Sequence, residues 1–108
     1  MHFPSLYRIQ QRFEEASIDD VAGAVRDAFA DFDPADKIRP GQSVAVGVGS
    51  RGTHDLRVLV KSTVECLKAM ALKPYIMPAM GSHGGATGAG QAQVLAELGI
   101  TEDAMGVP

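Results

Sequence analysis

Cysteine and clustered basic charge are both scarce in this sequence. Cys66 is the only cysteine among 108 residues, so an internal disulfide and a CxxC metal site are both excluded. A chain with so little cysteine is typical of a reducing compartment, and we expect a cytoplasmic protein. The net charge is −3 and the ten Lys and Arg residues are scattered, which argues against a nucleic acid as a partner.

Long apolar runs are absent as well. No stretch of the sequence approaches the roughly 20 apolar residues that a membrane span requires. The start Met1–Ser5 does not have the order of a signal peptide, in which basic residues precede an apolar run. We therefore expect no membrane partner. The chain instead has 45% hydrophobic residues and a mean hydropathy near zero, the composition of one soluble globular domain over residues 1–108.

The first third of the chain predicts a strand and a helix. Across residues 5–13, apolar and polar side chains tend to alternate, which predicts an edge strand. Ser17 followed by Asp20 resembles a helix N-cap with an acidic residue in the first turn. Apolar residues then recur at helical spacing as far as Phe32, so we expect a helix of about four turns.

The order strand, glycine-rich loop, helix occurs twice in the rest of the chain. Residues 43–49 are nearly all apolar, which suits a strand buried on both faces of a parallel sheet. Helical periodicity follows from Leu56 onward, then a second strand over residues 74–80, a glycine-rich loop over residues 81–90 and a helix closed by Gly99. The pattern predicts an α/β fold, with a parallel-sheet βαβ core of right-handed crossover, an N-terminal edge strand and helix, and the form of an incomplete Rossmann-like domain.

Two parallel strands are few for a sheet of this kind. Doubly wound sheets commonly have about five strands, and a small domain buries only a small core. We therefore expect residues 1–108 to be truncated on the C-terminal side. The domain would then need either a further C-terminal segment or a self-association partner.

The first glycine-rich loop resembles a dinucleotide fingerprint but departs from it. Gly47, Gly49 and Gly52 spell GxGxxG between a strand and a helix. The fingerprint also requires an acidic residue about 20 positions on, at the end of the second strand, and residues 76–80 contain none. Arg51 occupies a position at which a pyrophosphate needs a small residue. We favour an organic anion or phosphate bound by the Arg51 guanidinium at a helix N-terminus, and a plain surface arginine is the alternative.

The second glycine-rich loop contains a histidine that packing does not explain. His83 is followed by Gly84 and Gly85, which allow positive φ angles and a close approach of the backbone to a ligand. A histidine in such a loop is a candidate general acid or base. Ser82 or Thr87 can cap the following helix, whose free N–H groups favour an anion. The alternative is a mobile surface loop with a solvated histidine.

Both loops follow a strand, so both lie at the carboxyl edge of the predicted sheet, where open α/β sheets bind ligands. Neighbouring strands are about 5 Å apart, so Arg51 and His83 can face one small ligand. This pair suits an anionic substrate such as a 2-hydroxy acid. His2 and His54 are interpreted as solvated, with His54 a secondary candidate. His83 has no second ligand at useful spacing, so we expect no metal-binding residue in this chain.

Two motifs resemble the N-terminal domain of the nickel-dependent lactate racemase family: Gly49-Ser50-Arg51-Gly52 and Pro78–Thr87. The resemblance continues to Gln91 and residues 99–102. It implies an enzyme that interconverts 2-hydroxy acid enantiomers through a nickel pincer nucleotide, with histidines as acid and base. It also implies that His83 is catalytic and that Arg51 and Ser50 bind the substrate. The positions expected near the cofactor are Gly49, Gly52, Ser82, Gly84, Gly85 and Thr87.

The sequence departs from this family at three motif positions, and several functional residues of the family have no counterpart in residues 1–108. Val48 replaces a motif aspartate, Ser50 a threonine, and Gly84 an arginine after the catalytic histidine, which argues against lactate itself. The second catalytic histidine, the cofactor-anchoring lysine and the nickel-binding histidine of the family lie beyond residue 108. We thus expect the N-terminal part of a racemase- or epimerase-like enzyme that is inactive alone. The alternatives are a non-catalytic nucleotide- or anion-binding module and an inactive fragment.

Overall fold

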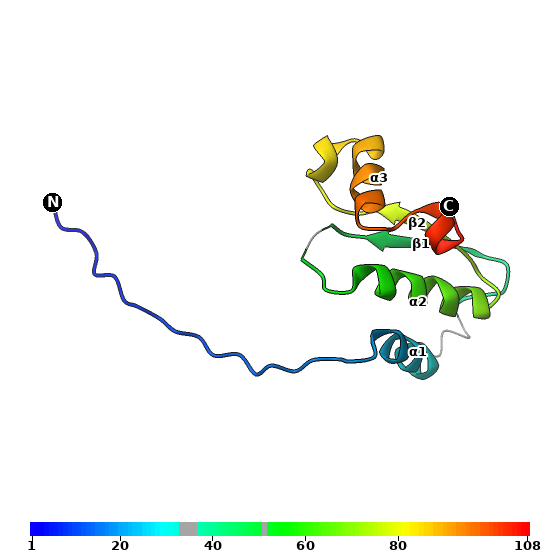
Figure 1. The fold of residues 1–108 in the computed structure, drawn as a ribbon, viewed down its shortest axis with the longest axis horizontal. Coiled ribbons are helices and arrows are strands. Elements are labelled where there is room, and N and C mark those ends of the chain that lie inside the picture. The colour runs from blue at the N-terminus through cyan, green and yellow to red at the C-terminus, as the bar shows by residue number, and fades with distance from the viewer. Residues whose placement is uncertain (33–36, 51) are drawn as a thin grey trace.

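The computed structural model describes residues 1–32, 37–50 and 52–108. Its elements are, in chain order, α1 (Val21–Asp31), β1 (Ser43–Val48), α2 (Leu56–Ala69), β2 (Lys73–Pro78), the short 3-10 helix η1 (His83–Ala86), α3 (Gly88–Glu97) and α4 (Glu102–Met105) (Figure 1). The two strands form one sheet with helices packed alongside, which confirms the predicted mixed α/β class. None of the helices described is long and apolar enough to cross a membrane.

The strands β1 and β2 run parallel and pair along their whole length, with α2 as the connection between them. This is the predicted βαβ unit. Prolines are rare inside sheets because they have no N–H to donate. Pro74 and Pro78 are accommodated in β2 because their nitrogens face its outer edge, the edge at which the Ile76 N–H donates to the Pro108 carbonyl at 2.7 Å. The ladder between the two strands therefore loses no hydrogen bond to them.

Only one face of this sheet is covered by the described part of the chain. Along β1 the valines are buried or partly buried, and the residues between them are exposed. β2 alternates in the same way, and Tyr75 and Met77 are 42% and 48% exposed. The prediction that residues 43–49 are buried on both faces is therefore wrong for this structure. An apolar run predicts double burial only when helices cover both faces of the sheet.

The helix α2 supplies the centre of the hydrophobic core. Val60, Val64 and Leu67 are four and three positions apart, so they share one face of the helix, and each is at most 7% exposed. This confirms the helix predicted from Leu56 onward. The buried cluster draws on both strands' ends, α2, α3 and the C-terminal segment: Val48, Val60, Val64, Met80, Leu95, Ile100, Met105 and Val107.

The C-terminal segment returns to the sheet through α4. The Thr101 hydroxyl accepts a backbone N–H at the start of α4 at 3.2 Å and caps this helix. Lys61 and Lys68 on α2 donate from Nζ to the carbonyls of Met105 and Gly106 at 3.2 and 2.7 Å. The sequence pattern does not predict α4, because four residues are too few for a helical periodicity to show.

Residues 1–18, the N-terminal arm, extend away from the body of the molecule (Figure 1). They have no regular secondary structure, and Leu6, Tyr7, Ile9 and Phe13 are each at least 75% exposed. The edge strand predicted over residues 5–13 is therefore absent from this structure. Alternation gives a segment the pattern of a strand, but a strand also needs a partner, and the arm does not lie against either edge of the sheet.

The helix α1 begins one turn later than the sequence predicts. Asp20, and not Ser17, is its N-cap, and the Asp20 carboxylate accepts the Gly23 N–H at 2.8 Å. The helix contacts α2. An Asp at the N-cap is as effective as a Ser, and its charge also interacts favourably with the helix dipole.

Candidate functional site

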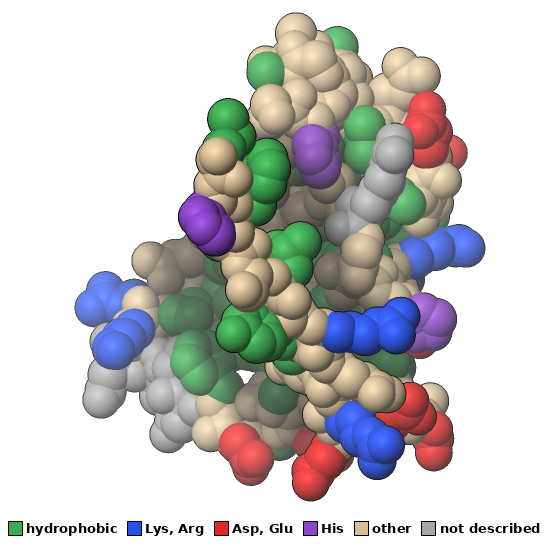
Figure 2. Space-filling view, turned by 90° about the vertical axis from the view of Figure 1, so that its left-hand side faces the viewer, with side chains coloured by type: hydrophobic (Ala, Val, Ile, Leu, Met, Phe, Trp, Pro, Cys, Tyr) green, Lys and Arg blue, Asp and Glu red, His purple; other side chains and the backbone are tan. Residues whose placement is uncertain are grey.

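The carboxyl ends of β1 and β2 bring two loops to the same end of the sheet. The first loop, residues 49–55, leads from β1 to α2, and the second loop, residues 79–87, leads from β2 to α3. Both follow parallel strands, so they lie together as the order of elements predicts. Figure 2 looks onto this end of the molecule, with the N-terminal arm directed toward the viewer.

One side-chain hydrogen bond joins the two loops. The Ser50 hydroxyl bonds with Nδ1 of the His83 imidazole, although the two residues are 33 positions apart. Ser50 is partly buried two residues after β1, and His83 is the first residue of η1. This bond engages Nδ1 of the ring and does not involve Nε2. The group that orients this imidazole is therefore a serine hydroxyl rather than a carboxylate.

The second loop takes a left-handed course that its glycines permit. Gly84 and Gly85 have φ angles of 62° and 70°, and Ala86 follows at 56°. The Gly84 backbone also crosses the first turn of α3. A Cβ on Gly84 would lie 2.5 Å from the Gly90 carbonyl carbon, and a Cβ on Gly90 would overlap the Gly84 carbonyl oxygen. Glycine is thus required at both positions by the crossing, whereas the space around Gly85 is open to a ligand.

The polar side chains at the second loop differ in the hydrogen bonds that they make. Thr87 is the N-cap of α3, and its hydroxyl accepts the Gly90 N–H at 3.1 Å. Of the two predicted caps, Thr87 is therefore the correct one, while Ser82 is exposed and makes no capping bond. Gln91 donates from Nε2 to the Gly81 carbonyl at 2.7 Å and ties the start of the loop to α3. The cofactor contacts expected of Ser82 and Thr87 stay predictions.

The first loop is described only in part, because Arg51 lies outside the described residues. The anion contact predicted for its guanidinium therefore stays a prediction. Gly52 has a φ of 97° and open space around it, a conformation that glycine adopts without strain. A Cβ at Gly49 would meet only the Ala79 carbonyl oxygen, at 3.9 Å, so the backbone there does not require glycine.

The other histidines stand apart from this pair. His54 has a side chain that is 98% exposed, and its Nε2 lies 3.6 Å from the carboxylate of the adjacent Asp55. His2 is exposed on the N-terminal arm. Within residues 1–32, 37–50 and 52–108, no three His, Cys, Asp or Glu side chains are grouped so that they could hold a metal ion.

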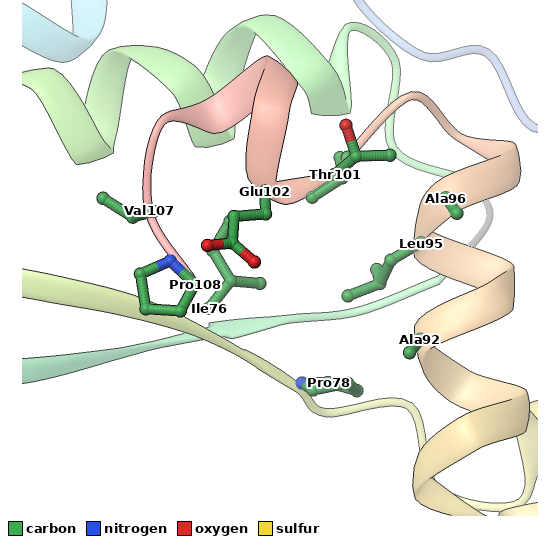
Figure 3. A pocket seen from close by; sticks show the side chains of 10 residues that line it. Ile76, Pro78, Ala92, Leu95, Ala96, Thr101, Glu102, Val107 and Pro108 are labelled. Carbon is green, nitrogen blue, oxygen red and sulfur yellow. The ribbon is translucent and has the colours of Figure 1, made fainter.

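A separate apolar cavity lies between β2, α3 and the C-terminal segment (Figure 3). It has a volume of about 270 Å³, and Ile76, Leu95 and Val107 are among the aliphatic residues that line it. Thr101 and Glu102 are its only polar lining residues. The cavity contains no histidine and does not include the Ser50–His83 pair, so it is separate from the two loops.

The sequence predicts a ligand contact for Ser50 but not its bond to His83. The available signal was positional, because Ser50 follows β1 and His83 follows β2 within a few residues of the same sheet edge. Comparison of the chain with protein-family models, with curated proteins and with solved structures gave no match. The functional interpretation therefore rests on the motifs of the two loops and on the geometry of this pair.

Proposed function

We propose that this chain is the N-terminal part of a racemase- or epimerase-like enzyme that acts on 2-hydroxy acids. In this proposal the two loops bind an organic anion, and His83 takes a proton from the ligand at Nε2 and returns it. The observation that carries the proposal is the hydrogen bond between Ser50 and His83. A hydroxyl that holds Nδ1 fixes the direction of the imidazole, which a general acid or base requires.

Each loop supplies residues with a proposed role. Ser50 is the positioning residue for His83, and Arg51 binds the carboxylate of the ligand through its guanidinium. Gly85, with a positive φ and open space around it, lets the backbone approach a ligand closely. The two-stranded unit is proposed to be part of a larger Rossmann-like sheet, and its uncovered face supports this because such sheets carry helices on both faces.

The cofactor proposed by resemblance is a nickel pincer nucleotide, which supplies the acceptor and donor of the hydride in this class of reaction. The described residues contain no group of side chains suited to hold a metal ion. In this proposal none of the described residues is a nickel ligand. The contribution of the chain's own residues is to orient the ligand and to exchange a proton at His83.

Binding is the test that this chain allows by itself. Both enantiomers of lactate, glycerate and longer 2-hydroxy acids would be titrated into labelled protein, with NMR detection of the imidazole and loop amide signals. We expect the His83 ring and amides of both loops to shift. His83→Gln should weaken binding about tenfold, the value of one hydrogen bond of about 1.4 kcal/mol. The matched control His54→Gln should leave the affinity unchanged.

Catalysis is tested in the longer context that the proposal implies. The chain would be joined to the remaining catalytic parts and the nickel cofactor, and loss of optical rotation would be followed over the same acids. His83→Gln should lower the rate at least about 100-fold, as removal of a general acid or base does. Equal rates for wild type and His83→Gln, or ligand shifts confined to His54, would disprove the assignment of His83.

A second function is favoured by one feature of the second loop. The backbone changes from the right-handed region at Ser82 to the left-handed region at Gly84, ahead of the capped start of α3. Successive backbone N–H groups at such a change of hand form a concave anion site without any catalyst. Calorimetry separates the two proposals. Nucleotide binding that survives His83→Gln and is lost in Arg51→Ala would favour a binding module over an enzyme.

A further inference from the structure

The outer edge of β1 has no partner within the described chain. β1 pairs only with β2, and on that side the Val48 carbonyl accepts the Ala79 N–H at 2.8 Å. The N–H and C=O of one strand residue point to the same edge, and successive residues alternate between edges. The backbone groups of Ala45 and Gly47 therefore face the outer edge. An edge of this kind is a template for pairing with another strand.

An apolar hollow lies beside this edge, between β1 and α2. It has a volume of about 320 Å³. Val46 and Val48 of β1 form one wall, and Leu56 and Leu59 of α2 are on the other. Leu59 is 38% exposed although it is a large aliphatic residue on the helix that supplies the core. The hollow lies where the side chains of a further strand would enter the core.

The N-terminal arm has the side-chain pattern of such a strand. In an extended chain Tyr7, Ile9 and Phe13 share one face, and they are 84%, 87% and 75% exposed. Gln11 also lies on that face, and the opposite face carries Leu6, Arg8, Gln10 and Arg12. Hydrophobic side chains lie uncovered along the arm at the front of Figure 2. An open sheet edge beside an apolar hollow accommodates a strand of this kind, with one mainly apolar face and one mainly polar face.

We propose that the N-terminal arm of one copy adds to the outer edge of β1 in a second copy, with the side chain of Ile9 in its hollow and those of Tyr7 and Phe13 along the same face on either side of it. The exchange is reciprocal, because both copies have the same arm and the same edge. A buried aromatic side chain removes about 150–250 Å² from water, so two arms and the walls they cover bury about 1,500–2,000 Å², the area of a stable dimer.

The position of α1 favours pairing of the arm with β1 of a second copy over pairing with β1 of its own chain. Ala22 of α1 lines a cavity with Val58, Ser62 and Glu65, so the arm begins on that side of α2. The hollow opens on another side, that of Leu59 and its neighbours. From its root on α1 the arm runs away from its own β1 (Figure 1).

The test measures association of the whole chain by sedimentation equilibrium. We expect a dimer that Ile9→Asp weakens at least tenfold, because the new carboxylate would enter the hollow. The matched control Gln10→Asp places the same charge on the solvated face and should leave the dimer intact. Both residues are exposed in the arm, so neither change should alter the free energy of unfolding of the monomer.

The occupant is identified in a mixture of isotope-labelled and unlabelled chains. Nuclear Overhauser effects between the Ile9 methyl groups of one copy and Val46 or Leu59 of the other are expected. A chain that stays monomeric at all concentrations would overturn the proposal. So would a dimer weakened equally by both substitutions, or contacts of Ile9 confined to its own chain.

Discussion

The crossing of Gly84 and Gly90 leads to a quantitative prediction about how His83 is held. A methyl group at Gly90 would overlap the Gly84 carbonyl oxygen and lie 2.9 Å from the Thr87 hydroxyl. Carbon atoms in ordinary contact are about 3.5–4.0 Å apart, so η1 or α3 has to move. Gly90→Ala should therefore cost about 1–3 kcal/mol for overpacking, with about 1 kcal/mol more for the weakened Thr87 cap.

Gly88→Ala is the matched control, two residues earlier in the same helical turn. A Cβ at Gly88 would meet no atom within 4 Å, and its φ is not positive. This substitution should raise stability by about 0.4–1 kcal/mol, because alanine restricts the unfolded chain more than glycine does. The two variants, which differ only in position, should therefore be separated by about 2.4–5 kcal/mol in the free energy of unfolding.

The assay is urea unfolding followed by circular dichroism, with NMR of the His83 ring as a second measurement. In Gly90→Ala the displaced loop should also lose the bond between His83 and Ser50, seen as a changed ring nitrogen signal. In Gly88→Ala that signal should stay. If both variants are equally stable and keep the His83 signal, the backbone crossing does not position the imidazole.

Two further predictions concern stability alone. Thr101→Ala removes the cap of α4 and should lower the free energy of unfolding by about 1 kcal/mol, whereas Ser82→Ala, which removes no cap, should change it little. Met105→Ala empties a core position that is 1% exposed and should cost about 2–5 kcal/mol, against a much smaller effect of Met77→Ala at 48% exposure. Urea unfolding measures both pairs, and equal effects within either pair would contradict the burial or capping described.

The βαβ unit could be predicted because each of its elements has a distinct pattern. An apolar run over residues 43–49 predicted β1, and helical spacing of Val60 and Val64 predicted α2. The pattern over residues 5–13 predicted a strand that the structure does not form. Periodicity reports the preference of a segment, while a strand also depends on a partner elsewhere in the sheet, which the local sequence does not specify.

The sequence predicted where the candidate site lies, but it did not predict the hydrogen bond between Ser50 and His83. Two loops that follow parallel strands must share a sheet edge, so the nearness of His83 to the first loop follows from topology alone. Its bond to Ser50 is a side-chain contact between residues 33 positions apart, which neither the local pattern nor the topology specifies. The sequence also suggests a ligand reason for Gly84, while the structure shows that the crossing with α3 requires this glycine.

The two loops of the candidate site are held in place by different contacts. His83 belongs to a loop tied to α3 by the Thr87 cap and by the bond from Gln91 to the Gly81 carbonyl, and α3 is anchored in the core by Leu95. Ser50 is joined to that unit by its bond to His83. An acid–base group is effective when its carrier is rigid. Substitutions in the first turn of α3 that displace the second loop, as Gly90→Ala does, should therefore disturb the proposed proton exchange at His83 even though they touch neither Ser50 nor a ligand.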